Sequence, residues 1–385
     1  MDFRLHMRTI LALLLCVAAS FVQAQTAPQI PPPPPIAAKA YLLLEYGNES
    51  PLVSLNTDER IEPASLTKLM TAYLTFAALR QKTLKADQVI PVSTRAWKSE
   101  GSRMFIEPNR PVTVDELIRG MIVQSGNDAC VALAEAIAGS EEAFAQMMTK
   151  EAQRLGMKST NFMNATGLPN PQHYTTARDL AVLAQAIIRD FPEYYPLYSM
   201  REYRYNNITQ ANRNRLLWTD PSVDGMKTGY TDNAGYCLIT SAKRGARRLV
   251  SVVLGTASEA ARASESQKLL NYGFQFFDSV RLYEKNQPVA TLRVWKGALN
   301  NVRAGFLSDF HVTVPKGQAE RLKATVETRQ PLLAPIAMGQ QIGLLKLELD
   351  GKPYREYPLV ALEKVEVAGI LGRGWDSIRL LIKGP

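Results

Sequence analysis

Histidine is scarce in this chain, and its scarcity argues against several kinds of hydrolytic site. The sequence has three histidines among 385 residues, and one of them, His6, lies in an N-terminal leader. Only His173 and His311 are left for a metal site or a Ser/His/Asp triad. No His-Glu-x-x-His, Cys-x-x-Cys or Gly-x-Ser-x-Gly pattern occurs. We therefore expect neither a metal ion nor another cofactor.

Cysteine is equally rare, and dense basic patches are lacking. Cys16 belongs to the leader, which leaves Cys130 and Cys237. Two cysteines permit one disulfide, but their spacing does not require it, and two free buried thiols fit equally well. We interpret Cys130 as a buried structural thiol. Because no basic patch is interleaved with aromatic residues, nucleic acid is not an expected partner.

The leader itself predicts export. Arg4 and Arg8 precede an apolar run over residues 10–22, and Ala24 ends a stretch of the kind that signal peptidase cleaves. The run is too short to span a bilayer, which takes about 20 residues. Residues 1–24 are therefore predicted to be a secretory signal peptide. Their removal, with two arginines and one aspartate, lowers the formal charge from +9 to +8.

Three changes of composition divide the rest of the chain. Residues 25–39 include five consecutive prolines, which predict an extended linker. Residues 40–287 mix helical and strand patterns and are numerous enough to hold a core and a cleft. Residues 288–368 alternate short β-type runs with Pro, Gly and polar turns, which predicts a small all-β domain.

Within residues 40–287 several elements can be placed. A buried strand begins near Tyr41, and an antiparallel hairpin is predicted around Gly245, followed by a helix over residues 259–277. Capping residues predict three more helices, of which the first runs to about Val123; these caps are Thr113, Ser140 and Thr176.

The C-terminal segment, residues 369–385, forms an amphipathic pattern. At helical spacing its apolar residues fall in one stripe, made of Ile370, Leu371, Trp375, Ile378, Leu381 and Ile382. A basic, aromatic-bearing helix of this kind can lie in a membrane interface. Docking of the same helix on its own β domain is the alternative.

Ser65-Leu66-Thr67-Lys68 places a hydroxyl and an amine one helical turn apart. From here apolar residues recur at helical intervals, which predicts an amphipathic helix; they are Leu66, Leu69, Tyr73, Phe76 and Leu79. Positions i and i+3 share a face, so Lys68 can act as a base for Ser65. The N–H groups and dipole of a helix N-terminus would favour an alkoxide or an oxyanion. An N-cap serine followed by a solvated lysine would explain the same pattern.

Two further motifs make coincidence a poor explanation. Ser125-Gly126-Asn127 falls in a loop between two predicted helices, and Lys227-Thr228-Gly229 lies just before the predicted hairpin. Each triplet alone is common, but the ordered set of three motifs is far more specific. Together they predict a serine acyl-transfer site.

In these residues the chain resembles the penicillin-binding proteins, and more closely the low-molecular-weight serine D-alanyl-D-alanine carboxypeptidases of the penicillin-binding protein 5/6 type. The segments 63–71, 212–218 and 224–229 share the pattern of that family. The resemblance implies an α+β fold with a β-lactamase/transpeptidase-like catalytic domain, whose antiparallel sheet is flanked by helices. A small all-β domain and an amphipathic C-terminal helix would follow.

The resemblance also assigns roles in an acyl-transfer reaction. Ser65 would attack the carbonyl of the penultimate D-alanine with Lys68 as base, and terminal D-alanine would leave. Ser125 would pass a proton to the leaving amine, and Asn127 would hold the substrate amide. Backbone N–H groups of Ser65 and of Tyr230 or its neighbour would form the oxyanion hole.

The substrate's terminal carboxylate would be bound on the strand side. Lys227 and Thr228 would hold it, and Gly229 would let the peptide approach the strand closely. Arg213 and Arg262 are further candidates, because arginine binds carboxylates in bidentate geometry. His173 is a minor candidate for lining the site.

The same resemblance implies partners and a location. The substrate would be a peptidoglycan pentapeptide ending in D-Ala-D-Ala, β-lactam antibiotics would be covalent inhibitors, and the role would lie in peptidoglycan maturation and cell shape. The leader and tail together predict a peripheral protein on the periplasmic face of the inner membrane. The oligomeric state is left open.

Three other functions would use part of the same pattern. A serine β-lactamase shares the acylation residues, but one class uses a glutamate for deacylation, and no glutamate occurs between Gly156 and Leu180. An endopeptidase acting on D-Ala cross-links would use the same motifs. A non-catalytic cell-wall-binding protein could retain the fold alone.

Overall fold

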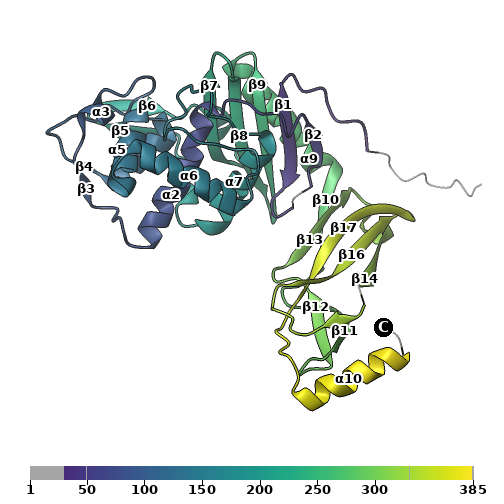
Figure 1. Cartoon of the computed structure of the whole chain (residues 1–385). Helices are drawn as coiled ribbons and strands as arrows, with labels where there is room; N and C mark the ends of the chain where they lie inside the picture. Colours follow the sequence, from purple (N-terminus) through teal and green to yellow (C-terminus); the bar gives the residue numbers. More distant parts are fainter. Residues whose placement is uncertain (1–29, 49, 329, 384–385) are drawn as a thin grey trace, which may run out of the picture. The chain divides into compact units, whose positions relative to one another are not determined.

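The computed structural model describes residues 30–383 except residues 49 and 329. Figure 1 shows the arrangement of its helices and strands. The signal peptide predicted for residues 1–24 lies outside the described residues. Within the described part of the chain, no helix combines the length and the apolar character needed to cross a membrane.

An antiparallel five-stranded sheet organises the larger, mixed part of the chain. Its strands, in spatial order, are β2 (Val53–Leu55), β1 (Ala40–Glu45), β9 (Arg247–Thr256), β8 (Gly235–Arg244) and β7 (Val223–Thr231). The hairpin predicted around Gly245 is therefore confirmed as β8–β9. Strand β7 ends the sheet and pairs only with β8, so its other edge is open to the segment that carries Ser65.

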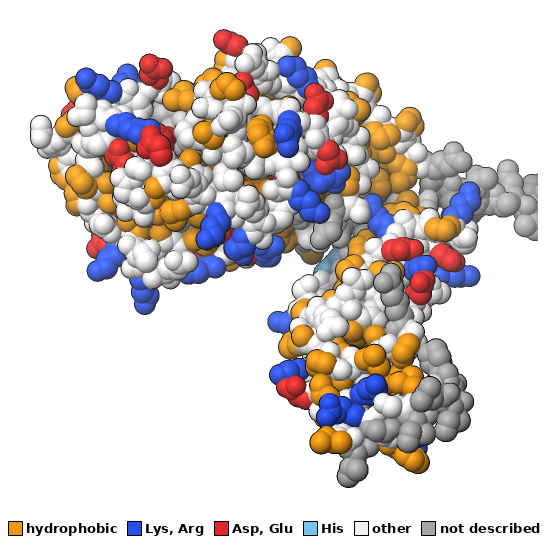
Figure 2. All heavy atoms as spheres, viewed as in Figure 1, with side chains coloured by type: hydrophobic (Ala, Val, Ile, Leu, Met, Phe, Trp, Pro, Cys, Tyr) orange, Lys and Arg blue, Asp and Glu red, His pale blue; other side chains and the backbone are white. Residues whose placement is uncertain are grey.

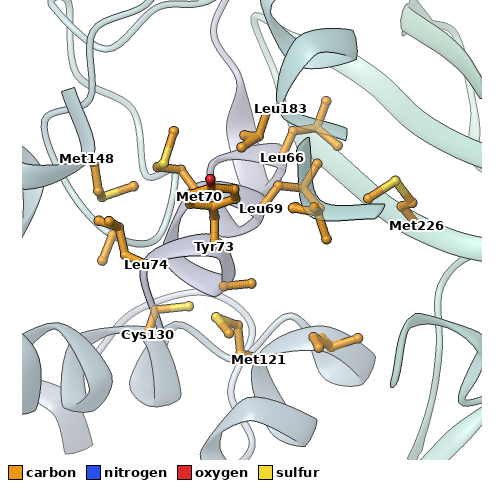
Figure 3. Packing of buried hydrophobic residues seen from close by; sticks show 14 of the residues in the cluster. Leu66, Leu69, Met70, Tyr73, Leu74, Met121, Cys130, Met148, Leu183 and Met226 are labelled. Atoms are coloured by element: carbon orange, nitrogen blue, oxygen red, sulfur yellow. The ribbon is translucent and has the colours of Figure 1, made fainter. Parts of the chain in front are cut away.

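Helices cover both faces of this sheet, because neighbouring strand residues point to opposite sides. Helix α9 (Glu259–Phe276) packs on β8 and β9, where a Cβ at Gly273 would meet Leu43 and Leu249. On the other face, α7 (Ala177–Asp190) packs on β9 and β1. This second face continues into the main core, which α2 (Lys68–Arg80) crosses (Figures 1 and 3).

Helix α2 is not amphipathic, contrary to the prediction. Its residues from Lys68 to Phe76 are all buried, including the unpredicted Met70 and Leu74. Figure 3 shows Leu69, Met70, Tyr73 and Leu74 of this helix among other buried side chains, including Met121 and Cys130. The periodicity of the strongest apolar residues was real, but the helix packs against α5, α6 and α7, so almost every face is covered.

The predicted helix caps are confirmed, and one helix end differs. Thr113 forms a capping box at α4 (Val114–Arg119), and Ser140 caps α6 (Glu141–Leu155). Thr176 caps α7. The α4 helix stops at Arg119 rather than near Val123 and gives way to a π turn, η3 (Gly120–Gln124). Gly120, where the π turn begins, packs closely on Met104, since a Cβ at Gly120 would lie 2.2 Å from the Met104 sulfur.

Shorter elements complete this part of the chain. Two small two-stranded sheets are β3–β4 and β5–β6, with strands Val89–Ile90, Val112–Thr113, Glu202–Tyr205 and Ile208–Ala211. The remaining helices and turns are η2 (Ala64–Thr67), α3 (Thr94–Trp97), α5 (Asn127–Ala138), η4 (Tyr195–Ser199) and α8 (Leu216–Thr219).

The C-terminal part is rich in β structure, as predicted. β10 (Phe277–Tyr283) pairs with β13 (Phe310–Pro315). A six-stranded sheet has the order β14 (Leu322–Thr328), β16 (Gln341–Leu349), β17 (Lys352–Ala361), β12 (Asn301–Gly305), β11 (Pro288–Trp295) and β15 (Leu332–Leu333). This C-terminal part has its own apolar core, which includes Val302, Val312 and Leu345. A short turn, η5 (Ala319–Arg321), precedes β14, and helix α10 (Ile370–Lys383) ends the described chain.

Candidate active site

Ser65 lies in the 3-10 turn η2, directly before α2. It is partly exposed, whereas Leu66, Thr67 and Lys68 are buried. Gly167 packs closely against this turn, because a Cβ at Gly167 would lie 1.8 Å from the carbonyl oxygen of Ala64. The predicted helix start is thus confirmed in position, although its first turn is 3-10 rather than α. Ser65 is thus the partly exposed residue of a closely packed segment.

Lys68 is fully buried and has three partners. Its Nζ lies 3.0 Å from Ser65 Oγ, 2.7 Å from Asn127 Oδ1 and 2.5 Å from the carbonyl oxygen of Thr166. An amide oxygen and a carbonyl oxygen can only accept hydrogen bonds. A neutral amine at this position would therefore donate its two hydrogens to Asn127 and Thr166. Its lone pair would then face the hydroxyl of Ser65, as a base requires.

The pKa values of the two buried lysines support a base in this position. Burial lowers the pKa of Lys68 to about 8, and the positive charge of Arg213 acts in the same direction. Burial lowers the pKa of Lys227 well below its ordinary value, with further contributions from Lys68 and Arg213. The site therefore disfavours holding both amines charged at once.

Ser125 and Asn127 reach the site from the junction of η3 and α5. Ser125 is buried and adopts the left-handed conformation with a φ of 63°, an unusual state for a residue other than glycine. Its hydroxyl accepts a hydrogen bond from Lys227 Nζ at 3.0 Å. The π turn and this strained residue together aim the hydroxyl at the strand side of the site.

Asn127 is fixed by contacts on both ends of its amide. While its Oδ1 accepts from Lys68, its Nδ2 donates to the carbonyl oxygen of Glu100 at 2.6 Å. Its backbone N–H donates to Ser102 O at 2.7 Å. Gly101 between them has a φ of 78°, and a Cβ there would lie 2.9 Å from Asn127 Nδ2. This supporting segment was not anticipated from the sequence.

Strand β7 brings the third motif beside Ser65. Lys227, Thr228 and Gly229 are all buried. A Cβ at Gly229 would lie 3.2 Å from the carbonyl oxygen of Pro63 and 3.2 Å from Leu66 Cγ. Glycine thus favours the close approach of β7 to the serine segment, in addition to any approach of a ligand.

The two candidate arginines occupy different positions. Arg262 is 3% exposed and donates to Gly229 O at 3.4 Å and to Glu259 at 3.2 Å, so it supports β7 from the α9 side. Arg213 is exposed, yet it is close enough to influence the pKa values of Lys68 and Lys227. Arg213 is therefore the better placed of the two to meet an incoming anion.

Three contacts of the site were not predicted. Thr166 contributes its carbonyl oxygen to Lys68. His173, a minor candidate in the sequence, is buried with its Nε2 2.8 Å from Thr67 Oγ1, and its Nδ1 accepts from Met163 N–H. Asp128 accepts four backbone N–H groups, three of them from residues 104–106. These contacts position the motif residues and do not themselves face Ser65 Oγ.

The other acidic and sulfur groups nearby are occupied or inert. Glu141 approaches the segment that lacks glutamate, but its two oxygens are bound to Ala165 N–H and Arg95. Cys130 and Cys237 are both free and buried, and burial raises the pKa of the Cys130 thiol to about 12. Among the described residues no cluster of three His, Cys, Asp or Glu side chains could hold a metal ion.

The sequence matches the family model for D-alanyl-D-alanine carboxypeptidase over residues 25–258, and the model for the C-terminal domain of penicillin-binding protein 5 over residues 277–367. The D-alanyl-D-alanine carboxypeptidase DacC of Escherichia coli (strain K12) is 42% identical over 355 residues, which cover 90% of this chain and 89% of that protein.

Solved structures agree with these matches. Penicillin-binding protein 5 from Haemophilus influenzae superposes with a TM-score of 0.81 at 42% identity, covering 87% of this chain and 99% of that one. Penicillin-binding protein D2 from Listeria monocytogenes, in its ampicillin-bound form, has a TM-score of 0.55 at 31% identity, covering 62% of this chain and 98% of that one. With the three motifs assembled around one serine, the chain belongs to the D-alanyl-D-alanine carboxypeptidase family, in the penicillin-binding protein 5 group.

Proposed function

We propose that this chain carries out its family's reaction through Ser65, releasing the terminal D-alanine from peptidoglycan pentapeptides that end in D-Ala-D-Ala. One observation supports this most strongly. The amine of Lys68 is fully buried, has two acceptors for its hydrogens, and lies 3.0 Å from Ser65 Oγ. A serine with such a neighbour is suited to nucleophilic catalysis without histidine.

In the first step Ser65 Oγ forms a bond to the carbonyl carbon of the penultimate D-alanine. The hydroxyl proton passes to Lys68 Nζ, and the negative charge moves to the carbonyl oxygen. Backbone N–H groups of Ser65 and Tyr230 stabilise that oxygen. The carbon–nitrogen bond then breaks as the amine of the leaving D-alanine takes up a proton. We assign the delivery of that proton to Ser125, whose hydroxyl accepts a hydrogen bond from Lys227. Ser125 in turn takes up the proton that Lys68 removed from Ser65, so Lys68 is a neutral amine again before water attacks.

Water completes the cycle. It attacks the ester on Ser65, gives up one proton to the base, and releases the shortened peptide with a free carboxylate as Ser65 regains its hydrogen. A β-lactam would form the same ester, which is why β-lactams are expected to be covalent inhibitors. Asn127 is assigned to hold the amide of the peptide that stays on the enzyme.

Binding of the substrate's terminal carboxylate is assigned to the strand side of the site. Lys227 and Thr228 lie on β7, and Arg213 adds an exposed positive charge near both lysines. Arg262 contributes through its hydrogen bond to Gly229. A carboxylate beside Lys227 would favour the charged form of that lysine and leave Lys68 as the neutral amine.

The proposal is tested by measuring free D-alanine released from a pentapeptide ending in D-Ala-D-Ala. Wild-type protein should release it catalytically, and Ser65→Ala should release none above background. Cleavage of a cross-linked peptide dimer, without release of D-alanine from the pentapeptide, would favour the endopeptidase alternative. Fast turnover of penicillin would favour the β-lactamase alternative, although both carboxylate oxygens of Glu141 are already bound to Arg95 and Ala165 N–H.

The pH dependence of acylation should follow Lys68. Because the base is the unprotonated amine, the rate should rise with pH and level off above a midpoint of about 8. Arg213→Gln removes a positive charge that lowers this pKa, so its midpoint should move to higher pH. Arg215→Gln, a neighbouring exposed arginine, should leave the midpoint unchanged. The measurement is the rate of fluorescent penicillin labelling between pH 5 and 10, and equal midpoints in all three proteins would contradict the assignment.

We also propose that the signal peptide directs export to the periplasm and that residues 40–287 and 288–368 are the catalytic and β domains. Basic and acidic side chains are both spread over the visible face (Figure 2). The last helix, α10, is proposed to bind the periplasmic face of the inner membrane. Its Ile370 is 80% exposed and its Trp375 58% exposed, as a membrane-contacting residue would be.

Deleting residues 369–385 tests the membrane role. The truncated protein should move from the membrane fraction to the soluble periplasmic fraction and retain penicillin labelling. The hydrogen bond from Lys296 N–H to Asp376 Oδ2 suits the alternative, in which the helix docks on the β domain. Unchanged membrane fractionation after the deletion would rule out the proposed role.

A further inference from the structure

Glu62 joins the segment of Ser65 to the segment that follows Gly229. Its Oε2 accepts a hydrogen bond from Thr231 Oγ1 at 2.9 Å, and its Oε1 accepts one from Asn233 Nδ2 at 2.9 Å. The Thr231 hydroxyl also accepts from the backbone N–H of Ala234 at 3.0 Å. Both carboxylate oxygens therefore hold the turn between β7 and β8.

These two segments carry the N–H groups assigned to the oxyanion hole. Glu62 precedes Ser65 by three residues, and Thr231 directly follows Tyr230. An oxyanion hole needs its donors about 2.7–3.1 Å from the developing charge, so a small change in their separation weakens both. The Glu62 contacts lie close enough in sequence to each donor to control that separation.

Other contacts of the serine segment do not perform this task. Ile61 exchanges two backbone hydrogen bonds with Thr175, and Gly167 packs against Ala64. These contacts fix the segment from the side away from β7. Across the side that faces β7, a Cβ at Gly229 would lie 3.2 Å from Pro63 O and 3.2 Å from Leu66 Cγ, which shows that the two segments are closely packed there. Such packing limits approach but does not prevent separation.

We propose that Glu62 is a positioning residue for the oxyanion hole, and that its carboxylate sets the separation of the Ser65 and Tyr230 N–H groups by holding Thr231 and Asn233. The inference rests on the proposed acyl transfer at Ser65. The Thr231 hydroxyl has a defined orientation, because its single proton goes to Glu62 while its oxygen accepts from Ala234. Glu62 thus acts through backbone geometry and does not touch the substrate.

Losing the Glu62 contacts should slow acylation without lowering stability. Glu62 is only partly buried and Asn233 is exposed, so losing these bonds should change the melting temperature little. Glu62→Ala should slow acylation by a penicillin roughly 10- to 100-fold, a part of the effect of losing one oxyanion donor. The non-covalent affinity measured before acylation, and the pH midpoint set by Lys68, should stay at their wild-type values.

Matched variants make the test specific. Glu59→Ala removes the same charge three residues earlier, from the lining of the same cavity of about 250 Å³, and should acylate as wild type. Glu62→Gln keeps one acceptor and should recover part of the rate. Thr231→Val should slow acylation, and combining it with Glu62→Ala should slow it no further than Glu62→Ala alone.

The outcomes are distinguishable. A labelled wild type with Glu62→Ala acylating as fast as Glu59→Ala would overturn the inference alone. A large fall in melting temperature together with a changed pH midpoint in Glu62→Ala would also overturn it, because both would indicate a general disruption of the site. A wild-type protein that penicillin does not label would overturn the proposed acyl transfer and the inference together.

Discussion

Replacing Lys68 with methionine should slow the acylation of Ser65 by a penicillin roughly 10²- to 10⁴-fold, the usual contribution of a general base. Methionine has similar length and lacks the amine, so Ser65 would have to lose its proton without help. Because Lys68 is only 1% exposed, an apolar side chain can occupy its place without exposing apolar surface. The measurement is the rate at which a fluorescent penicillin labels Ser65 at pH 8, in samples quenched at successive times.

Two controls separate the base from the charge. Lys68→Arg keeps a positive charge but cannot release its proton near neutral pH, so it should be as impaired as Lys68→Met. Lys150→Met makes the same substitution at an exposed position on α6 and should label normally. Normal labelling by Lys68→Met would show that another group accepts the proton.

Asp128→Ala should lower the free energy of unfolding by roughly 3–5 kcal/mol, because a buried N–H donor left without an acceptor costs about 1–3 kcal/mol and several donors would be affected. The carboxylate is fully buried, and its oxygens accept the N–H groups of Met104 and Ala129, and of Phe105 and Ile106, at 2.8 to 3.2 Å. Without it these buried donors lose their partner.

The same substitution should also reduce acylation, because the loop held by Asp128 continues into the residues that fix Asn127. Asp115→Ala is the matched control, since Asp115 makes only a half-exposed ion pair with Arg119 and should change stability by about 0–1 kcal/mol. Denaturant unfolding of both variants, followed through penicillin-binding capacity, gives the comparison. Equal stability of the two variants would contradict the role of Asp128.

The residues of the three motifs could be foreseen because local rules place them. Ser65 and Lys68 are three residues apart and share a helical face. Thr113, Ser140 and Thr176 were predicted to cap helices, and the structure confirms these caps. The meeting of the motifs in one place could not be worked out from spacing and came from the family resemblance. Their separations in sequence set no distance in space.

Other features gave no usable signal. Thr166 serves Lys68 with a backbone carbonyl, which any residue type could provide. Asp128 binds backbone N–H groups, so no partner side chain marks it in the sequence. The spacing of the largest apolar residues predicted an amphipathic α2. Such spacing cannot show that other helices cover the remaining faces as well. The amphipathic interpretation failed for that reason.

The most direct test of the account is mass-spectrometric mapping of the protein after brief exposure to a penicillin. The account predicts one adduct, carried by the peptide that contains Ser65, formed rapidly in wild type and lost in Ser65→Ala. An adduct on another residue, or an undiminished adduct in Ser65→Ala, would contradict the assignment of Ser65 as the nucleophile.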